Sequence, residues 1–182
     1  GDVQCWGVSG VGSTGLNSFT SIAIGSGGTT PRVRDVYPIP LVDNLKAVSV
    51  TTGQQHTCAL LVNGKAQCWG SGPSSGYYDG SSTTSLGTGK RQADVEGFVP
   101  LPGTVLYIAA SKATAHTCAV LLDAPPICFS GSVHPSAGEL GVGDTVAWGG
   151  TARLTNIPAI ALLAPPPTCQ EASDFAICPT PS

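Results

Sequence analysis

A motif that recurs about every 60 residues is the feature that most limits what this chain can fold into. Cys5, Cys68 and Cys128 stand at spacings of 63 and 60 residues, and an aromatic residue follows each of them. His56 and His116 are 60 residues apart, and each is followed by Thr-Cys-Ala. A period of this length, with two apolar runs joined by a turn, predicts small antiparallel sheets. Such sheets must stack on one another, because one of them alone cannot bury both of its faces.

Composition also favours an all-β structure. Charged residues make up only 10% of the chain, whereas 24 glycines and 15 prolines favour turns over helices. The apolar residues come in short runs with valine and isoleucine, such as 46–50, which are typical of strands. The net charge of −3 comes with no basic patch, so we expect no nucleic-acid partner. No apolar run approaches the roughly 18 residues that cross a bilayer, and no phosphate-binding glycine motif occurs. We therefore expect neither membrane insertion nor a cofactor.

The full pattern of one period resembles the RCC1 repeat. The residues that carry this resemblance are the G-x-x-H-T-C-A-L of 53–60, the Asn-Gly of 63–64, the Cys-Trp-Gly of 68–70 and the G-x-L-G-x-G of 138–143. The resemblance implies four-stranded blades of a β-propeller that usually has seven blades. It covers about three periods, over residues 1–163. In this alignment Ala113 takes the place of Gly53.

Side chains that recur with the period are expected to be structural. Trp6, Trp69 and Phe129 occupy matching positions and are predicted to be core aromatic residues. The resemblance implies that His56 and His116 are buried and hydrogen-bonded. A metal site is the alternative, because each histidine precedes a cysteine by two residues and so shares a strand face with it. No pair of closely spaced cysteines accompanies them, so we favour the structural interpretation.

The seven cysteines predict hairpins closed by disulfides and an oxidising compartment, either the secretory pathway or the cell exterior. A hairpin with the three-residue loop 62–64 places Cys58 opposite Cys68. Directly opposed residues of an antiparallel pair are close enough for a disulfide. The same spacing predicts a bridge between Cys118 and Cys128.

The other three cysteines lie toward the two ends of the sequence. Residues 164–182 are proline-rich and are interpreted as an exit segment, in which Cys169 and Cys178 could close a degenerate hairpin. Cys5 is left over. Because it matches Cys68, its partner is expected ten residues upstream, outside the sequence.

Binding is expected on loops, because the repeated blades serve as a scaffold. Tyr77, Tyr78 and Asp79 lie in a serine- and glycine-rich loop of the kind often used for recognition. The alternative is that both tyrosines pack on their own blade. Trp148 falls outside the aromatic positions of the repeat and is expected to be exposed. Residues 8–30 form a second polar stretch, interpreted as a disordered or glycosylated loop.

Together these features favour a non-enzymatic extracellular module, a structural or adhesive propeller within a larger surface or filament assembly. Its partners are expected to be proteins, including other modules or copies of the same assembly, and its Ser/Thr-rich loops could carry O-linked glycans. The scattered acidic residues suggest no catalytic pair. The alternative is a soluble recognition propeller that binds one partner, either an enzyme that it inhibits or a glycan. A more remote hypothesis, from the family name, is a small-GTPase exchange factor, which the cysteine pairs disfavour.

Overall fold

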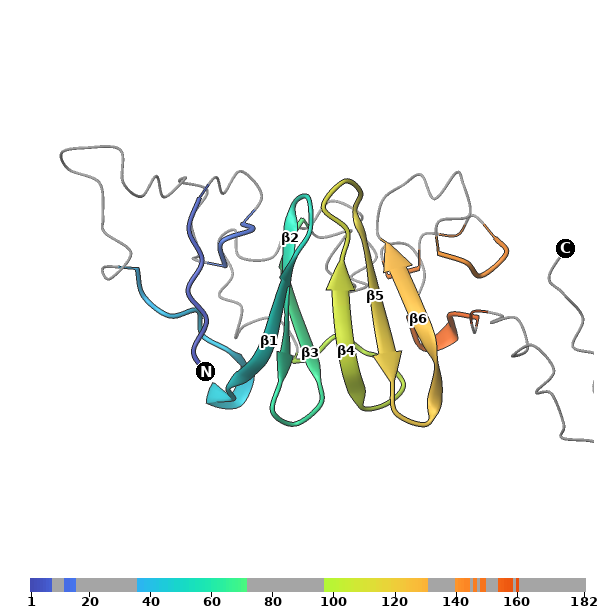
Figure 1. Cartoon of the computed structure of the whole chain (residues 1–182), viewed down its shortest axis with the longest axis horizontal. Coiled ribbons are helices and arrows are strands. Elements are labelled where there is room, and N and C mark those ends of the chain that lie inside the picture. Colours follow the sequence, from blue (N-terminus) through green and yellow to red (C-terminus); the bar gives the residue numbers. More distant parts are fainter. Residues whose placement is uncertain are drawn as a thin grey trace, which may run out of the picture.

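The computed structural model contains two antiparallel sheets that stand side by side (Figure 1). It describes residues 1–7, 12–15, 36–71, 97–130, 140–144, 146, 148–149, 154–158 and 160. Two short 3-10 turns, η2 (Val42–Asn44) and η5 (Leu154–Asn156), flank the sheets along the chain. Within these ranges no helix is long and apolar enough to span a membrane.

The first sheet contains β1 (Ala47–Thr52), β2 (His56–Leu61) and β3 (Ala66–Gly70), in that order across the sheet. All six residues of β2 are buried, since β2 has a strand on either side and packed residues on both faces. The β2–β3 hairpin has the expected three-residue loop, closed by the Leu61 amide donating to the Lys65 carbonyl at 2.9 Å.

The second sheet repeats the first with β4 (Val105–Ala110), β5 (His116–Leu121) and β6 (Ala124–Ser130). The two sheets also share an irregularity in strand pairing. The register between the first two strands shifts between Ala47 and Ser49 in one sheet and between Val105 and Tyr107 in the other. The all-β prediction and the repeat are therefore both confirmed.

The β5–β6 hairpin differs from its counterpart at the turn. Leu121 pairs with Ala124, which leaves a two-residue loop, and the register then shifts between Ala119 and Leu121. Prolines 125 and 126 supply no amide hydrogen for pairing. The shift restores the pairing of Cys118 with Cys128 beyond them.

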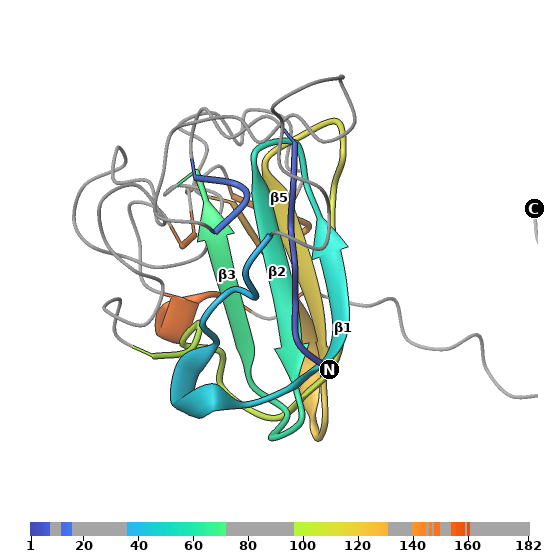
Figure 2. The same ribbon diagram turned by 90° about the vertical axis from the view of Figure 1, so that its left-hand side faces the viewer.

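Two apolar clusters cover the faces of the first sheet. One joins residues of β2 and β3 to the second sheet and includes Leu60, Ile108 and Phe129. The other includes Val3, Ile39 and Trp69. Figure 2 looks from the N-terminal side and shows residues 1–7 running along the first sheet beside β1 and β2.

Trp69 and Phe129 are fully buried, but the prediction that Trp6 is a core residue is wrong. The Trp6 side chain is 52% exposed. Trp69 pairs with Thr57 of β2 and donates its indole N–H to the Ser13 carbonyl at 3.1 Å. No described strand pairs with Trp6, so that indole lacks the cover that Trp69 has.

Each described sheet has three strands, whereas the resemblance implied four. The residues that follow β3 directly, 72–96, lie outside the described part of the chain. So do residues 131–139 after β6 and residues 161–182, which include the expected exit segment 164–182 with Cys169 and Cys178. Beyond β6 the described residues include one parallel bridge, between Ser130 and Gly149.

Candidate interaction surface

The β2–β3 and β5–β6 hairpins each carry a disulfide at the same position. Cys58 is bonded to Cys68, and Cys118 is bonded to Cys128, with α-carbons 4.0 Å apart in each pair. Cys5 has no disulfide partner among the described residues. Burial raises the pKa of the Cys5 thiol to about 11, so the thiol is protonated near neutral pH.

His56 joins the two sheets. Its Nε2 lies 2.7 Å from Thr117 Oγ1 on β5, in a fully buried contact. The other ring nitrogen, Nδ1, is buried without a hydrogen-bond partner. We therefore place the proton on Nε2, where it is donated to Thr117, because a buried N–H without an acceptor is the costlier arrangement. Burial, with a smaller effect of nearby His116, lowers the pKa of His56 to about 4, so the ring is neutral at neutral pH.

The corresponding loop of the second sheet is built differently. The Gly53 amide donates to the His56 carbonyl at 2.8 Å, and the Ser111 amide donates to the His116 carbonyl at 2.9 Å. Ser111 therefore takes the place of Gly53, and the alignment of Ala113 with Gly53 is corrected. The loop before His116 is two residues longer, and within it Thr114 Oγ1 lies 2.6 Å from His116 Nδ1.

The atoms that the metal alternative would use are engaged elsewhere. The sulfurs of Cys58 and Cys118 are in disulfides, and His56 bonds to Thr117. In the described part of the chain no three His, Cys, Asp or Glu side chains group as metal ligands.

Residues 47–76 match the family described as the Regulator of chromosome condensation (RCC1) repeat. The matched segment contains β1, β2 and β3, with His56 and the Cys58–Cys68 disulfide. Residues 47–76 thus match one RCC1 repeat, and the two described sheets have the fold of RCC1-type propeller blades. The second sheet repeats the same strand order, register shift and disulfide.

Solved structures share this RCC1-type fold. One is the crystal structure of Kap60 bound to yeast RCC1 (Prp20), with 15% identity and a TM-score of 0.56 over 83% of this chain and 32% of that chain. Another is human WBSCR16, with 19% identity and a TM-score of 0.55 over 81% of this chain and 38% of that one. The chain thus spans about a third of the length of these structures. No curated protein matches its sequence.

The sequence-predicted interaction residues have different outcomes. Tyr77, Tyr78 and Asp79 lie outside the described residues. The expectation that Trp148 is exposed is wrong. Its side chain is half-buried against the core, and the indole N–H donates to Asp144 Oδ1 at 3.1 Å. Packing together with a carboxylate acceptor holds this side chain in place.

Exposed apolar side chains lie on the first strand of each sheet. They include Val48 on β1 and Leu106 and Tyr107 on β4, and the Tyr107 side chain is 60% exposed. β1 and β4 are edge strands of their sheets and contact each other. We call these three residues the β1/β4 edge. Sequence reasoning missed it, because short apolar runs predict strands without showing which strand lacks a neighbour.

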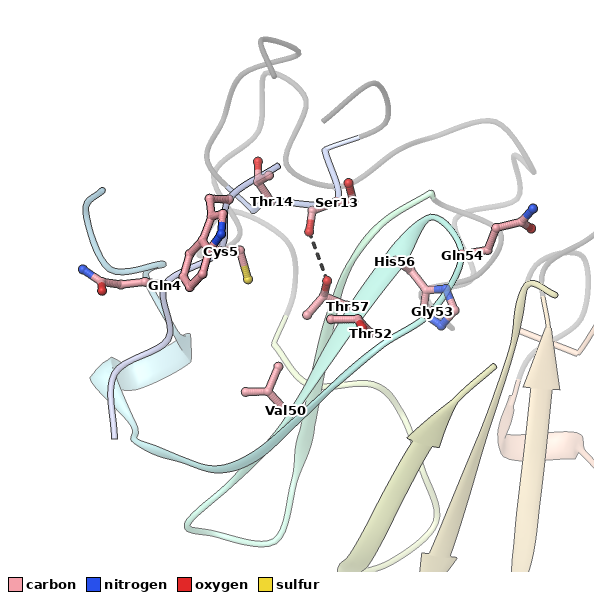
Figure 3. Close-up of a pocket in the computed structure, with 11 residues that line it drawn as sticks. Gln4, Cys5, Ser13, Thr14, Val50, Thr52, Gly53, Gln54, His56 and Thr57 are labelled. Atoms are coloured by element: carbon pink, nitrogen blue, oxygen red, sulfur yellow. Dashed lines mark hydrogen bonds between the residues drawn. The ribbon is translucent and has the colours of Figure 1, made fainter. Parts of the chain in front are cut away.

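An open pocket of about 330 Å³ lies between the N-terminal segment and the first sheet. Figure 3 shows Gln4 and Cys5 on one wall and Val50, Thr52 and Thr57 on the other. A second pocket of about 370 Å³ lies between residues 1–4 and 47–50 and shares Gln4 and Val50 with the first. We call the two pockets together the trough. The only sequence signal for it is that Cys5 lacks a partner.

Proposed function

We propose that this chain is part of an extracellular propeller that acts as a protein–protein interaction module in a surface or filament assembly. The observation that carries the proposal is the pair of disulfides at equivalent positions of successive blades. Disulfides repeated with the fold period suit an oxidising compartment and are rare in reducing ones. They therefore disfavour an intracellular exchange factor, despite the fold shared with yeast RCC1.

The interaction part of the proposal is supported by the β1/β4 edge. Aromatic and aliphatic side chains on a sheet edge suit contact with another protein surface. The yeast RCC1 structure was solved with Kap60 bound, so a protein partner on this fold has precedent. The partners that we propose are other modules or copies of the same assembly.

We further propose that the module is not an enzyme. The cysteines of both H-T-C motifs are in disulfides, and His56 is neutral and bonded to Thr117. These repeated residues therefore supply neither a thiolate nor a free general base. Their chemistry is that of structural support.

Self-association of beads coated with the oxidised protein tests the adhesive role. We expect the beads to aggregate, and Tyr107→Asp to reduce aggregation because a charge enters the apolar β1/β4 edge. Val62→Asp is the matched control, since Val62 is equally apolar and exposed but lies at a hairpin tip. Dispersed beads with the unchanged protein would contradict the adhesive role, and equal loss in both variants would contradict the assignment of the edge.

A further inference from the structure

Gly64, in the turn between β2 and β3, has a backbone conformation and surroundings that suit only glycine. Its φ of 72° lies in the left-handed region, and a β-carbon there would lie 2.5 Å from Thr104 Cγ2, just before β4. The Gly64 carbonyl also accepts a hydrogen bond from the Val105 amide of β4 at 2.7 Å. The turn is therefore part of the contact between the two blades.

The residue before this glycine is Asn63, whose side chain is exposed. In an Asn-Gly pair the backbone nitrogen of the glycine can attack the side-chain amide carbon of the asparagine. Glycine favours this reaction, because it has no side chain to hinder the approach and its backbone rotates freely. The other two asparagines that the structure describes, Asn44 and Asn156, are also exposed, but they precede leucine and isoleucine, whose side chains crowd the nitrogen.

In the folded hairpin both reacting groups are held by hydrogen bonds. The Gly64 amide donates to the Leu61 carbonyl at 2.9 Å, and Asn63 Oδ1 accepts the Lys65 amide at 3.1 Å. The Gly64 nitrogen attacks only after its proton has been removed, so its bond to Leu61 must break first. The reaction therefore requires the turn to open.

The Cys58–Cys68 disulfide restrains this opening. It joins β2 to β3 at directly paired positions, and both of its residues are fully buried. While the bond is intact the two strands stay together, and the turn that connects them has few open conformations. A thiol reductant cleaves the bond to two thiols, is itself oxidised to a disulfide, and so removes the restraint.

We propose that Asn63 is a site of spontaneous deamidation that the intact Cys58–Cys68 disulfide protects and that reduction of this disulfide exposes. The Gly64 nitrogen gives its proton to a base in the solvent and forms a bond to Asn63 Cγ, and the side-chain nitrogen leaves as ammonia. Water then opens the cyclic imide at one or the other carbonyl, which gives aspartate or isoaspartate. This modification goes beyond the proposed function and is independent of it, because it follows from the chemistry of one turn.

The two products differ in their effect on the hairpin. Aspartate keeps the length of the backbone and an oxygen that accepts the Lys65 amide. Isoaspartate carries the main chain through the side-chain carbons and so lengthens the loop that Leu61 and Lys65 close. The longer loop displaces the Gly64 carbonyl from Val105. A chain modified in this way while reduced therefore does not regain the full contact between the blades after reoxidation.

Peptide mapping by mass spectrometry, after incubation of the folded chain at mildly alkaline pH, measures deamidation at each asparagine. We expect Cys58→Ser/Cys68→Ser to raise the rate at Asn63 by at least about tenfold over the oxidised, unchanged chain, because the turn opens more often. Cys118→Ser/Cys128→Ser is the matched control. It removes a disulfide of the same sequence separation from the other hairpin and should leave the rate at Asn63 unchanged.

Equal acceleration in the two variants would overturn the proposal, since unfolding of the whole chain would then expose Asn63. A second measurement does not depend on the folding of either variant. In the unchanged chain, reduced and unfolded in urea, Asn63 should deamidate at least about tenfold faster than Asn44 and Asn156. Similar rates at the three positions would also overturn the proposal.

Urea denaturation of the reoxidised products tests the effect on the blades. The isoaspartyl form should unfold at a lower urea concentration than Asn63→Asp, which has the same charge and an unchanged backbone length. Equal midpoints for the two would overturn the predicted loss of the contact between the blades.

Discussion

The His56 ring lies directly against the α-carbon of Gly53, and this contact explains why a glycine stands three residues before the histidine. A β-carbon at Gly53 would lie 2.2 Å from His56 Cε1 and 2.6 Å from Nδ1. The side chain that replaces Gly53 in the second blade, Ser111, is accommodated because the loop there is two residues longer. A glycine at position 53 therefore leaves the space that the His56 ring occupies.

Gly53→Ala should lower the free energy of unfolding by about 1–3 kcal/mol, because the ring must move from a packed site. Urea denaturation of the oxidised protein measures the change. Gly103→Ala is the matched control, since a β-carbon there meets only the Leu122 carbonyl at 3.7 Å, an ordinary contact. A Gly53 variant as stable as the control would refute the role assigned to the contact.

His56 should also make stability depend on pH. Folding lowers its pKa from 6.5 to about 4, so between these values the unfolded chain binds a proton that the folded chain does not. The neutral His56 ring contributes fully to stability above pH 6.5. The free energy of unfolding then falls by about 3 kcal/mol in all as the pH drops toward 4. His56→Gln keeps a donor for Thr117 and should flatten this part of the profile, measured by urea denaturation between pH 4 and 8. An unchanged profile would contradict the assignment to His56.

At the scale of the element, the disulfide-bridged hairpin is the unit that was predicted best from the sequence. The spacing of Cys58 from Cys68 was sufficient, because opposed positions in a tight hairpin follow from the loop length. Pro125 and Pro126 changed the second turn without moving its disulfide, since a register shift compensates for the shorter loop.

The alignment of the loops could not be predicted, because two length differences cancel. The segment that leads into the first strand is two residues longer in the first blade (Leu41 to Ala47) than in the second (Leu101 to Val105). The loop between the first two strands is two residues shorter in the first blade (β1 to β2) than in the second (β4 to β5). The histidines and cysteines therefore keep a spacing of 60 residues, although Ser111, not Ala113, replaces Gly53. The trough escaped prediction for a related reason, since a repeat pattern does not show which strand edge lacks a neighbour.

Opening either disulfide should destabilise the chain by about 2–3 kcal/mol, the value for closing a loop of this length in the unfolded state. The paired variants Cys58→Ser/Cys68→Ser and Cys118→Ser/Cys128→Ser should give similar losses, because both bridges span ten residues. Denaturation with and without reductant measures them, and the chain with all four of these cysteines replaced by serine should no longer respond to reductant. A loss in one hairpin only would contradict their equivalence.

At the scale of the whole molecule, the two described blades are joined by hydrogen bonds between their strands and by a shared apolar core. His56 bonds to Thr117, and the Ala110 amide donates to Thr51 Oγ1 at 3.0 Å. The core cluster contains residues of both sheets, including Leu60 and Phe129. The two blades should therefore unfold together.

Thr117→Val should destabilise both blades by about 1–3 kcal/mol, because it leaves the buried His56 N–H without an acceptor. A single transition in circular dichroism and in fluorescence should persist at the lower midpoint. Thr52→Val is the control, since Thr52 is exposed on an edge strand and its loss should cost less than about 0.5 kcal/mol. Two separate transitions in the unchanged protein would show that the blades are independent.

Disulfide mapping of the unreduced protein from its native source, by mass spectrometry, tests the disulfide-bridged blades most directly. We expect peptides that link Cys58 to Cys68 and Cys118 to Cys128, with no free thiol at these four positions. Such peptides would establish that the propeller blades are stapled where the protein works. Free thiols at the four positions would contradict both the stapled blades and the extracellular function built on them.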